Sequence, residues 1–241
     1  MKEKVFITGA SGGIGSSITK RFNEIGHKLI LTSSSEEKLS KLMKLYGDQH
    51  DYYILDLSDL TNLESAMSQI VIDHPDISIL INNAGLTSDS LLLRMKLNQW
   101  QKVMDTNLSS NFVIIKSALP NMIKSKKGKI IGISSVVAIS GNPGQSNYVS
   151  SKSGMVGFYK SIAHEVATRN INVNVVSPGF IISPMTDKLT EVQKNKMLEN
   201  IPMKKFGEPN DVANLVYFLS SDKASYITGQ NFHVNGGMLM V

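Results

Sequence analysis

The sequence contains no cysteine and no apolar stretch of the length that crosses a membrane. Without cysteine, the chain can form no disulfide, no thiol nucleophile and no cysteine-ligated metal site. A membrane-spanning helix needs about 20 consecutive apolar residues. The N-terminal stretch MKEKVFITGA lacks the longer apolar run of a signal peptide. We therefore expect a cytoplasmic protein that has no contact with a membrane.

The sequence gives little indication of a metal site or of nucleic-acid binding. The five histidines are scattered along the chain without the spacing of metal ligands. The net charge of +5 is modest, and no nucleic-acid recognition motif accompanies it. Basic residues do gather at Lys124, Lys126, Lys127 and Lys129. Such runs are ordinarily solvated, but a basic face also favours an acidic or phosphorylated partner.

Strand-like and helix-like segments alternate along 241 residues, without a linker or an internal repeat. This length suits one α/β domain, residues 1–241. Strands are expected at 4–8, 28–31, 52–55, 77–81, 129–133, 171–176 and 231–234. Helices are expected at 36–46, 60–72, 100–122, 191–199 and 209–219, with two more ending near 25 and 167. The alternation predicts a Rossmann-like, doubly wound parallel sheet of about seven strands with helices on both faces.

Several polar or small residues directly follow the predicted strands. In a doubly wound sheet, ligands bind outside the carboxyl ends of the strands, so these residues should share one rim. They are Gly9, Asp56, Asn83, Ser135 and Pro178.

The turn GASGGIG, residues 9–15, lies between the first predicted strand and a helix. In this context glycines bind phosphate, because Gly9 and Gly13 let the backbone approach a pyrophosphate and Gly15 lets the helix pack closely. The N–H groups at the helix start then face the anion. The spacing is GxxxGxG, and an isolated glycine cluster can equally be an ordinary turn.

Tyr148 and Lys152 are four residues apart in YVSSK, so they share one helix face. A free tyrosine has a pKa of about 10, and a neighbouring ammonium group should lower that pKa toward the operating pH of acid–base catalysis. An isolated pair of this kind would more often belong to an ordinary amphipathic helix. Here it accompanies the glycine turn.

Together these motifs resemble the short-chain dehydrogenase/reductase family over essentially the whole chain. The resemblance rests on TGASGGIG, LDLSD, NNAG, TNLSS, ISSVV, YVSSK and PGF. Within the family, the stretches LLLRMKLNQW, GNPGQSNY, INVNVVSPGFI and YITGQNFHVNGGMLMV look most like those of bacterial reductases that act on 3-oxoacyl groups of acyl carrier protein. The resemblance implies NADPH-dependent reduction of this substrate in fatty acid biosynthesis.

The resemblance also implies four catalytic residues. Tyr148 would be the general acid, and Ser135 would hold the substrate oxygen. Lys152 would lower the pKa of Tyr148 and grip the nicotinamide ribose. Asn107 would hold a water that links Lys152 to solvent. Taken singly, Ser135 could merely cap a strand and Asn107 could merely interrupt a helix.

A larger set of residues is expected to bind the cofactor. It comprises Gly9, Ser11, Gly12, Gly13, Ile14, Gly15, Thr32, Ser34, Asp56, Asn83, Ala84, Gly85, Tyr148, Lys152, Ile181 and Ser183. NADPH is favoured over NADH, because no acid follows the second strand before Glu36. Gly12 departs from the basic residue of many NADPH-using relatives, so Arg21 or Lys38 would have to reach the phosphate. Asp56 should face the adenine amino group, or else start the next helix.

Residues 181–206 should form a substrate lid, with Met185, Met197 and Met203 as an adaptable apolar wall or as plain packing. The lysines at 124–129, with Arg169, are expected to bind an acidic acyl carrier protein. The resemblance further implies a homotetramer. The alternatives are another short-chain reductase, for acetoacetyl-CoA, a steroid or a sugar, and a non-catalytic NADP sensor.

Overall fold

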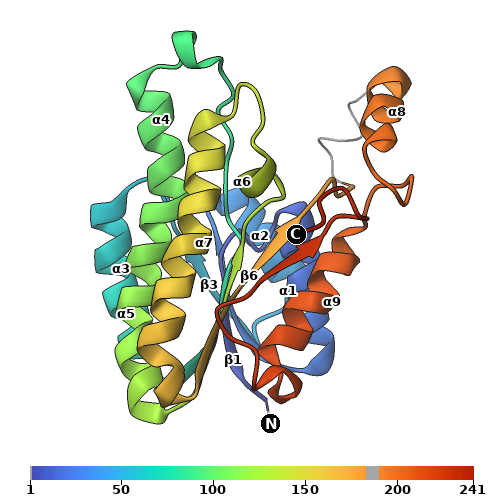
Figure 1. Cartoon of the computed structure of the whole chain (residues 1–241). Coiled ribbons are helices and arrows are strands. Elements are labelled where there is room, and N and C mark those ends of the chain that lie inside the picture. The colour runs from blue at the N-terminus through green and yellow to red at the C-terminus, as the bar shows by residue number, and fades with distance from the viewer. Residues whose placement is uncertain (1, 183–189) are drawn as a thin grey trace.

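A computed structural model describes residues 2–182 and 190–241 (Figure 1). The described residues form one parallel sheet with the strand order β3-β2-β1-β4-β5-β6-β7. The strands are β1 (Lys4–Ile7), β2 (Lys28–Ser33), β3 (Asp51–Ile54), β4 (Ile77–Asn82), β5 (Gly128–Ile133), β6 (Ile171–Pro178) and β7 (Asn231–Val234). This order, which reverses between β1 and β4, confirms the predicted doubly wound α/β fold.

Helices cover both faces of the sheet. One face carries α1 (Gly13–Ile25), α2 (Glu36–Tyr46) and α9 (Pro209–Ser220), and the other carries α3 (Leu60–Asp73), α5 (Ser110–Ser125) and α7 (Ser146–Val166) (Figure 1). The shorter elements are α4 (Leu97–Met104), α6 (Val137–Ser140), α8 (Glu191–Glu199), η1 (Leu92–Arg94), η2 (Asp105–Ser109), η3 (Ala167–Arg169) and η5 (Asp222–Ala224).

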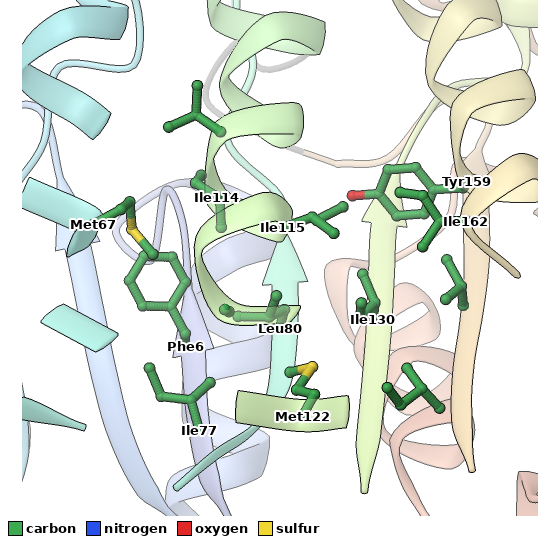
Figure 2. Packing of buried hydrophobic residues seen from close by; sticks show 14 of the residues in the cluster. Phe6, Met67, Ile77, Leu80, Ile114, Ile115, Met122, Ile130, Tyr159 and Ile162 are labelled. Atoms are coloured by element: carbon green, nitrogen blue, oxygen red, sulfur yellow. The ribbon is translucent and has the colours of Figure 1, made fainter. Parts of the chain in front are cut away.

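The two helical layers enclose two apolar cores. In β1, Val5 and Ile7 point to the core under α1, α2 and α9, whereas Phe6 points to the core under α3, α5 and α7. This alternation follows from the period of two in a strand. All six residues of β4 are buried, as expected for a parallel strand covered on both faces. Figure 2 shows the second core, with Met67, Met122 and Tyr159 around Leu80.

One predicted helix differs from the structure. The segment expected as a single helix at 100–122 starts earlier, at Leu97, and is interrupted by the π-helical turn η2. In this turn, Ser110 N–H bonds the carbonyl of Asp105, five residues back. The side chain of Asn107 leaves the helix surface and bonds a distant loop, which a helical pattern in the sequence cannot reveal. A smaller difference is that Pro178 ends β6 instead of following it.

The segment expected to be a lid starts and ends at one point on the body. Ile181 pairs with Gly207 in an isolated parallel bridge, and Ile182 N–H donates to the Gly207 carbonyl at 2.9 Å. Gly207 N–H in turn donates to the Phe180 carbonyl at 3.0 Å. We call these contacts the neck. Within residues 2–182 and 190–241, no helix combines the length and apolarity that a membrane span requires.

Candidate active site

The glycine turn follows β1 and folds back onto itself. Gly9 has φ +64°, and Gly12 N–H donates to the Gly9 carbonyl at 3.1 Å. A Cβ on Gly15 would lie 2.1 Å from the Gly9 carbonyl oxygen, so only glycine allows the start of α1 to pack here. No side chain caps α1, which leaves the backbone N–H groups of its first turn available to an anion. The turn therefore fits a dinucleotide pyrophosphate.

The loop after β4 holds this turn in place. The Asn83 amide donates to the carbonyls of Thr8 and Gly9, both at 3.1 Å, and the Thr8 hydroxyl accepts from the backbone N–H groups of Asn83 and Ala84, both at 3.0 Å. The Asn83 side chain is thus used within the protein, and the backbone of 83–85 is what lines the rim. Thr8 was not assigned a role from the sequence, although it opens the motif TGASGGIG.

The end of β2 brings hydroxyl groups to the same rim. Ser33 Oγ lies 3.5 Å from Ser11 Oγ, whereas Ser34 is exposed. The Thr32 side chain is buried within the sheet, and its carbonyl accepts from Ala10 N–H at 3.1 Å. Of the residues expected to bind the cofactor here, Ser11 and Ser34 are accessible and Thr32 is not. Ser33, which ends a strand two residues longer than expected, contacts Ser11 but is itself only 4% exposed.

The bases considered for a phosphate contact differ in their availability. The Arg21 guanidinium lies 5.3 Å from the ring centroid of Tyr217, which directs it toward α9. Lys38 is exposed in the first turn of α2, whose N-cap is Ser35. Lys38 therefore remains the better placed base.

Asp56 follows β3 and is exposed. One of its carboxylate oxygens accepts from the backbone N–H of Ser58 at 2.9 Å and from the Ser58 hydroxyl at 2.7 Å. These hydrogen bonds lower the pKa of Asp56. Asp59 and not Asp56 caps α3, accepting from Asn62 N–H at 3.1 Å. Asp56 is therefore exposed and has no helix-capping role.

The candidate catalytic residues come from α7 and the segment after β5. Tyr148 lies in the first turn of α7, and Lys152 lies one turn later. The Lys152 ammonium is buried, donates to the Ile133 carbonyl at 2.7 Å, and sits 5.8 Å from the centroid of the Tyr148 ring. Ser135, two residues beyond β5, is near enough to Tyr148 for its side chain to lower the pKa of the phenol.

The electrostatics of this group differ from the sequence prediction. Loss of hydration raises the pKa of Tyr148, the hydrogen bond from Ser135 opposes that rise, and the Asp89 carboxylate adds to it. The pKa of Tyr148 is therefore raised and not lowered as expected, because the loss of hydration outweighs the groups that favour the phenolate. Burial lowers the pKa of Lys152 itself to about 8.

Asn107, in the π-helical turn, is fully buried. Its amide donates to the Leu86 carbonyl at 2.9 Å and to Ser151 Oγ at 3.1 Å, and its oxygen accepts from Leu86 N–H at 2.9 Å. A Cβ on Gly85 would lie 3.2 Å from Lys152 Nζ and 3.3 Å from Asn107 Oδ1. The Asn107 side chain thus holds the loop after β4. Its oxygen accepts one hydrogen bond from the protein and can accept a second, so the expected water-binding role stays a prediction.

Two residues missed from the sequence join this loop to α7. Asn147 is fully buried, donates to the Ser88 carbonyl at 3.0 Å and accepts from Tyr148 N–H at 2.8 Å. Gln145 donates to Asp89 Oδ2 at 2.9 Å. Both lie in GNPGQSNY, a stretch that the sequence singled out only for its overall likeness.

The remaining predicted residues lie at or beyond the edges of this site. Ile181 is buried at the neck. Ser183 and Met185 lie outside the described residues. Lys129 is the second residue of β5 and Arg169 precedes β6, so the basic cluster lies at the amino ends of these strands, opposite the rim that carries Tyr148. Two of its lysines have partners: Lys127 pairs with Glu3 at 2.6 Å, and Lys129 donates to Asn172 at 2.7 Å.

A doubly wound sheet, a glycine turn and a Ser–Tyr–Lys group at one rim define a nucleotide-dependent reductase. A family model described as enoyl-(acyl carrier protein) reductase matches residues 9–239. The chain belongs to the short-chain dehydrogenase/reductase family.

Curated relatives narrow this class. The chain is 50% identical to a 3-oxoacyl-[acyl-carrier-protein] reductase of Rickettsia felis, over 98% of this chain and 96% of the relative. It is 46% identical to the protein of the same name from Buchnera aphidicola, over 100% and 98% of the two chains. The Staphylococcus aureus protein of that name is 44% identical, over 100% and 99%.

Proposed function

We propose that this chain reduces 3-oxoacyl-[acyl-carrier-protein] to 3-hydroxyacyl-[acyl-carrier-protein] with NADPH, as a step of fatty acid biosynthesis in the cytoplasm. One observation carries the proposal: Ser135, Tyr148 and Lys152 meet beside the glycine turn in a chain whose full length matches reductases of that name.

When bound, NADPH supplies a hydride to the carbonyl carbon of the substrate. Tyr148 donates its proton to the carbonyl oxygen, so that the ketone becomes an alcohol. Ser135 hydrogen-bonds the same oxygen and keeps it in line with the phenol. With a raised pKa, the phenol is protonated at neutral pH and has a proton to donate, and a group that brings this pKa closer to the operating pH makes it a more efficient general acid.

Lys152 serves the same step in two ways. With a pKa of about 8, its ammonium is mostly protonated near pH 7 and stabilises the phenolate that proton transfer leaves. Its position beside Gly85 also allows it to bind the ribose hydroxyls. The phenolate then regains a proton from solvent.

NADPH is favoured by the end of β2, where hydroxyl groups stand in place of a carboxylate. Ser34 and the N-terminus of α2 offer donors to a 2′-phosphate, and Lys38 supplies a charge. The test is kcat/KM for NADPH and NADH with wild type and Lys38→Ala. A loss restricted to NADPH supports this contact, and equal values for the two cofactors would contradict it.

We also propose that residues 1–241 form one domain, with 181–206 as the substrate lid held at the neck. Ile201 supports this, because it is buried and packs under Gly236, where a Cβ would lie 2.9 Å from Ile201 Cγ2. Met197 is half-buried and Met203 is exposed, so Met203 is the more available of the two for an acyl chain.

The acyl carrier protein is proposed to bind the basic face of Lys124, Lys126, Lys127, Lys129 and Arg169. Lys124 and Lys126 are exposed and supply its accessible charge. Within one chain, this face lies opposite the rim. The test is to reverse the charge at both exposed lysines, as Lys124→Glu with Lys126→Glu. KM for the carrier-bound substrate should rise more than KM for acetoacetyl-CoA. Equal effects would remove this face from the proposal.

A homotetramer is proposed from two apolar surfaces. Leu108, Phe112 and Phe158 line a hollow between α5 and α7, and half of the Phe112 side chain is exposed. Met240 and Val241 are exposed beside the edge strand β7. Light scattering should give four times the monomer mass for wild type and a smaller mass for Phe112→Glu.

The decisive experiment follows NADPH oxidation with acetoacetyl-[acyl-carrier-protein], acetoacetyl-CoA and crotonyl-[acyl-carrier-protein]. The third substrate tests enoyl reduction, which the description of the matching family model raises. Oxidation with the first substrate and little with the third supports the proposal. Turnover of the enoyl substrate alone would overturn it.

A further inference from the structure

Beneath the proposed site lies a chain of buried hydrogen bonds in which each group donates to the next. The Asn82 amide donates to the Tyr159 hydroxyl at 2.8 Å, and that hydroxyl donates to Asn111 Oδ1 at 2.7 Å. The Asn111 amide donates to the Asn107 carbonyl at 3.0 Å. From there, Asn107 donates to Ser151 at 3.1 Å.

The last link reaches the first turn of α7, since Ser151 Oγ donates to the Tyr148 carbonyl at 2.8 Å. Every side chain that donates in this chain is at most 2% exposed. Figure 2 shows Tyr159 with its hydroxyl directed away from β6, toward the side of α5. A single directed path thus connects the core to the residue proposed as general acid.

The path passes through the π-helical turn and stabilises it. A π-helical turn departs from the ordinary four-residue hydrogen-bond pattern of a helix. Two side chains in the first turn of α5 bond the carbonyls of this turn: Ser110 Oγ donates to Thr106 at 2.7 Å, and Asn111 donates to Asn107. Because Asn107 also holds both backbone groups of Leu86, the turn fixes the loop that borders Lys152.

The Tyr159 ring has its own support. A Cβ on Gly132 would lie 2.7 Å from two ring carbons of Tyr159, so the ring packs directly on the backbone of β5. The hydroxyl is therefore delivered to Asn111 from a rigid position. Its burial raises the pKa of Tyr159 strongly, which keeps the hydroxyl a donor at any working pH.

We propose that Tyr159 and Asn111 are positioning residues of the reductase site, holding the π-helical turn at Asn107 and, through it, the Leu86 loop and the start of α7. This inference rests on the proposed function for its kinetic consequence. Both side chains are buried, so neither is open to substrate or cofactor. Their effect reaches the reaction through the placement of Tyr148 and Lys152.

Tyr159→Phe is the primary test, because it keeps the ring under Gly132 and removes only the hydroxyl. We expect kcat to fall by at least about tenfold, since small misplacements of catalytic groups are costly, while KM for NADPH changes little. Tyr53→Phe is the matched control. It removes a hydroxyl that bonds His74 at 2.9 Å near the edge of the sheet, and kcat should stay at the wild-type value.

A double-mutant cycle separates positioning from plain stability. If Tyr159 acts through Asn111, Tyr159→Phe with Asn111→Ala should lose no more activity than the worse single variant. The inference would be overturned if the fold-loss of activity in the double variant equalled the product of the two single-variant losses. It would also be overturned if Tyr159→Phe kept the wild-type kcat. Should Tyr159→Phe fail to fold, kcat of Asn111→Ala decides by the same criterion.

A measurement that does not require catalysis distinguishes a failure of this inference from a failure of the proposed function. Carbon-13 labelling of tyrosine Cζ, with Tyr148→Phe to assign the signal, gives the pKa of Tyr148 in each variant. We expect Tyr159→Phe to lower it, because a loosened site admits water and relieves the desolvation that raises it. An unchanged titration would contradict positioning, whereas inactive wild-type protein would contradict only the proposed reaction.

Discussion

The Lys152 ammonium donates a 2.7 Å hydrogen bond to the carbonyl of Ile133, the last residue of β5. This contact fastens the second turn of α7 to the sheet at the level of the rim. It also explains why the ammonium lies over the face of the Tyr148 ring, 5.8 Å from the centroid. A buried cation with a single main-chain partner has measurable consequences.

Stability should depend on pH through Lys152. Its pKa falls from 10.5 to about 8 on burial, so between these values the unfolded state holds a proton that the folded state has lost. Stability from this group therefore rises with pH across that window, by about 3 kcal/mol at 1.36 kcal/mol per pKa unit. Below pH 8 the contribution is constant.

Urea unfolding at several pH values measures this effect as the difference between wild type and Lys152→Met. The difference should move in favour of wild type by about 3 kcal/mol from pH 8 to 10.5. Lys160→Met, which removes an exposed lysine of the same helix, is the control. A flat difference for Lys152→Met would contradict the burial of a titrating ammonium.

The rate of reduction should depend on pH through Asp89. Tyr148 must be protonated to act as the acid. Desolvation chiefly raises its pKa, and Asp89 adds to that rise. Asp89→Asn should therefore lower the pKa of Tyr148 and move the alkaline limb of kcat/KM to lower pH. Asp73→Asn is the matched control, since Asp73 also accepts from a glutamine, at 2.8 Å. A shift to higher pH would contradict the assignment.

Removing the phenol should abolish most turnover. Tyr148→Phe deletes the proton donor, so kcat should fall by about 10²–10⁴-fold, while NADPH affinity measured by fluorescence stays near the wild-type value. Ser135→Ala should lower kcat as well and raise the pKa of Tyr148, because the opposing hydrogen bond is lost. If Tyr148→Phe kept most of its activity, the mechanism would be wrong.

Two glycine substitutions should have opposite effects. Gly15→Ala places a Cβ 2.1 Å from the Gly9 carbonyl oxygen, so the backbone must shift. We expect a loss of about 1–3 kcal/mol in stability and of NADPH binding. Gly157→Ala, in α7, meets nothing within 4 Å and should gain about 0.5–1 kcal/mol. Thermal unfolding with and without NADPH measures both, and a tolerated Gly15→Ala would contradict the role of the turn.

The sequence predicted the fold well where local patterns decide the structure. The helix Glu36–Tyr46 and the strand Asn231–Val234 have their predicted bounds, because capping residues and apolar periodicity mark their ends. Distant contacts decided the exceptions. The interruption at Asn107 depends on Leu86, 21 residues away. No local pattern encodes that pairing.

The site followed the same division. Motif spacing was enough to place Ser135, Tyr148 and Lys152 near one another, since strand ends and helix turns have fixed geometry. The electrostatic direction at Tyr148 was predicted wrongly, because it depends on how much water the folded chain removes. Ser33, and not Thr32, contacts Ser11 for a similar reason, as the exact end of β2 depends on its pairing with β3.

The neck between Ile181 and Gly207 has an evolutionary consequence. Since both ends of the intervening segment leave the body at one bridge, doubling the number of residues between them would cost only about 0.6 kcal/mol in closure entropy. If this segment is the proposed lid, acyl-chain preference can diversify by its insertion, deletion or transplantation, while the phenol proposed as proton donor and the glycine turn stay untouched.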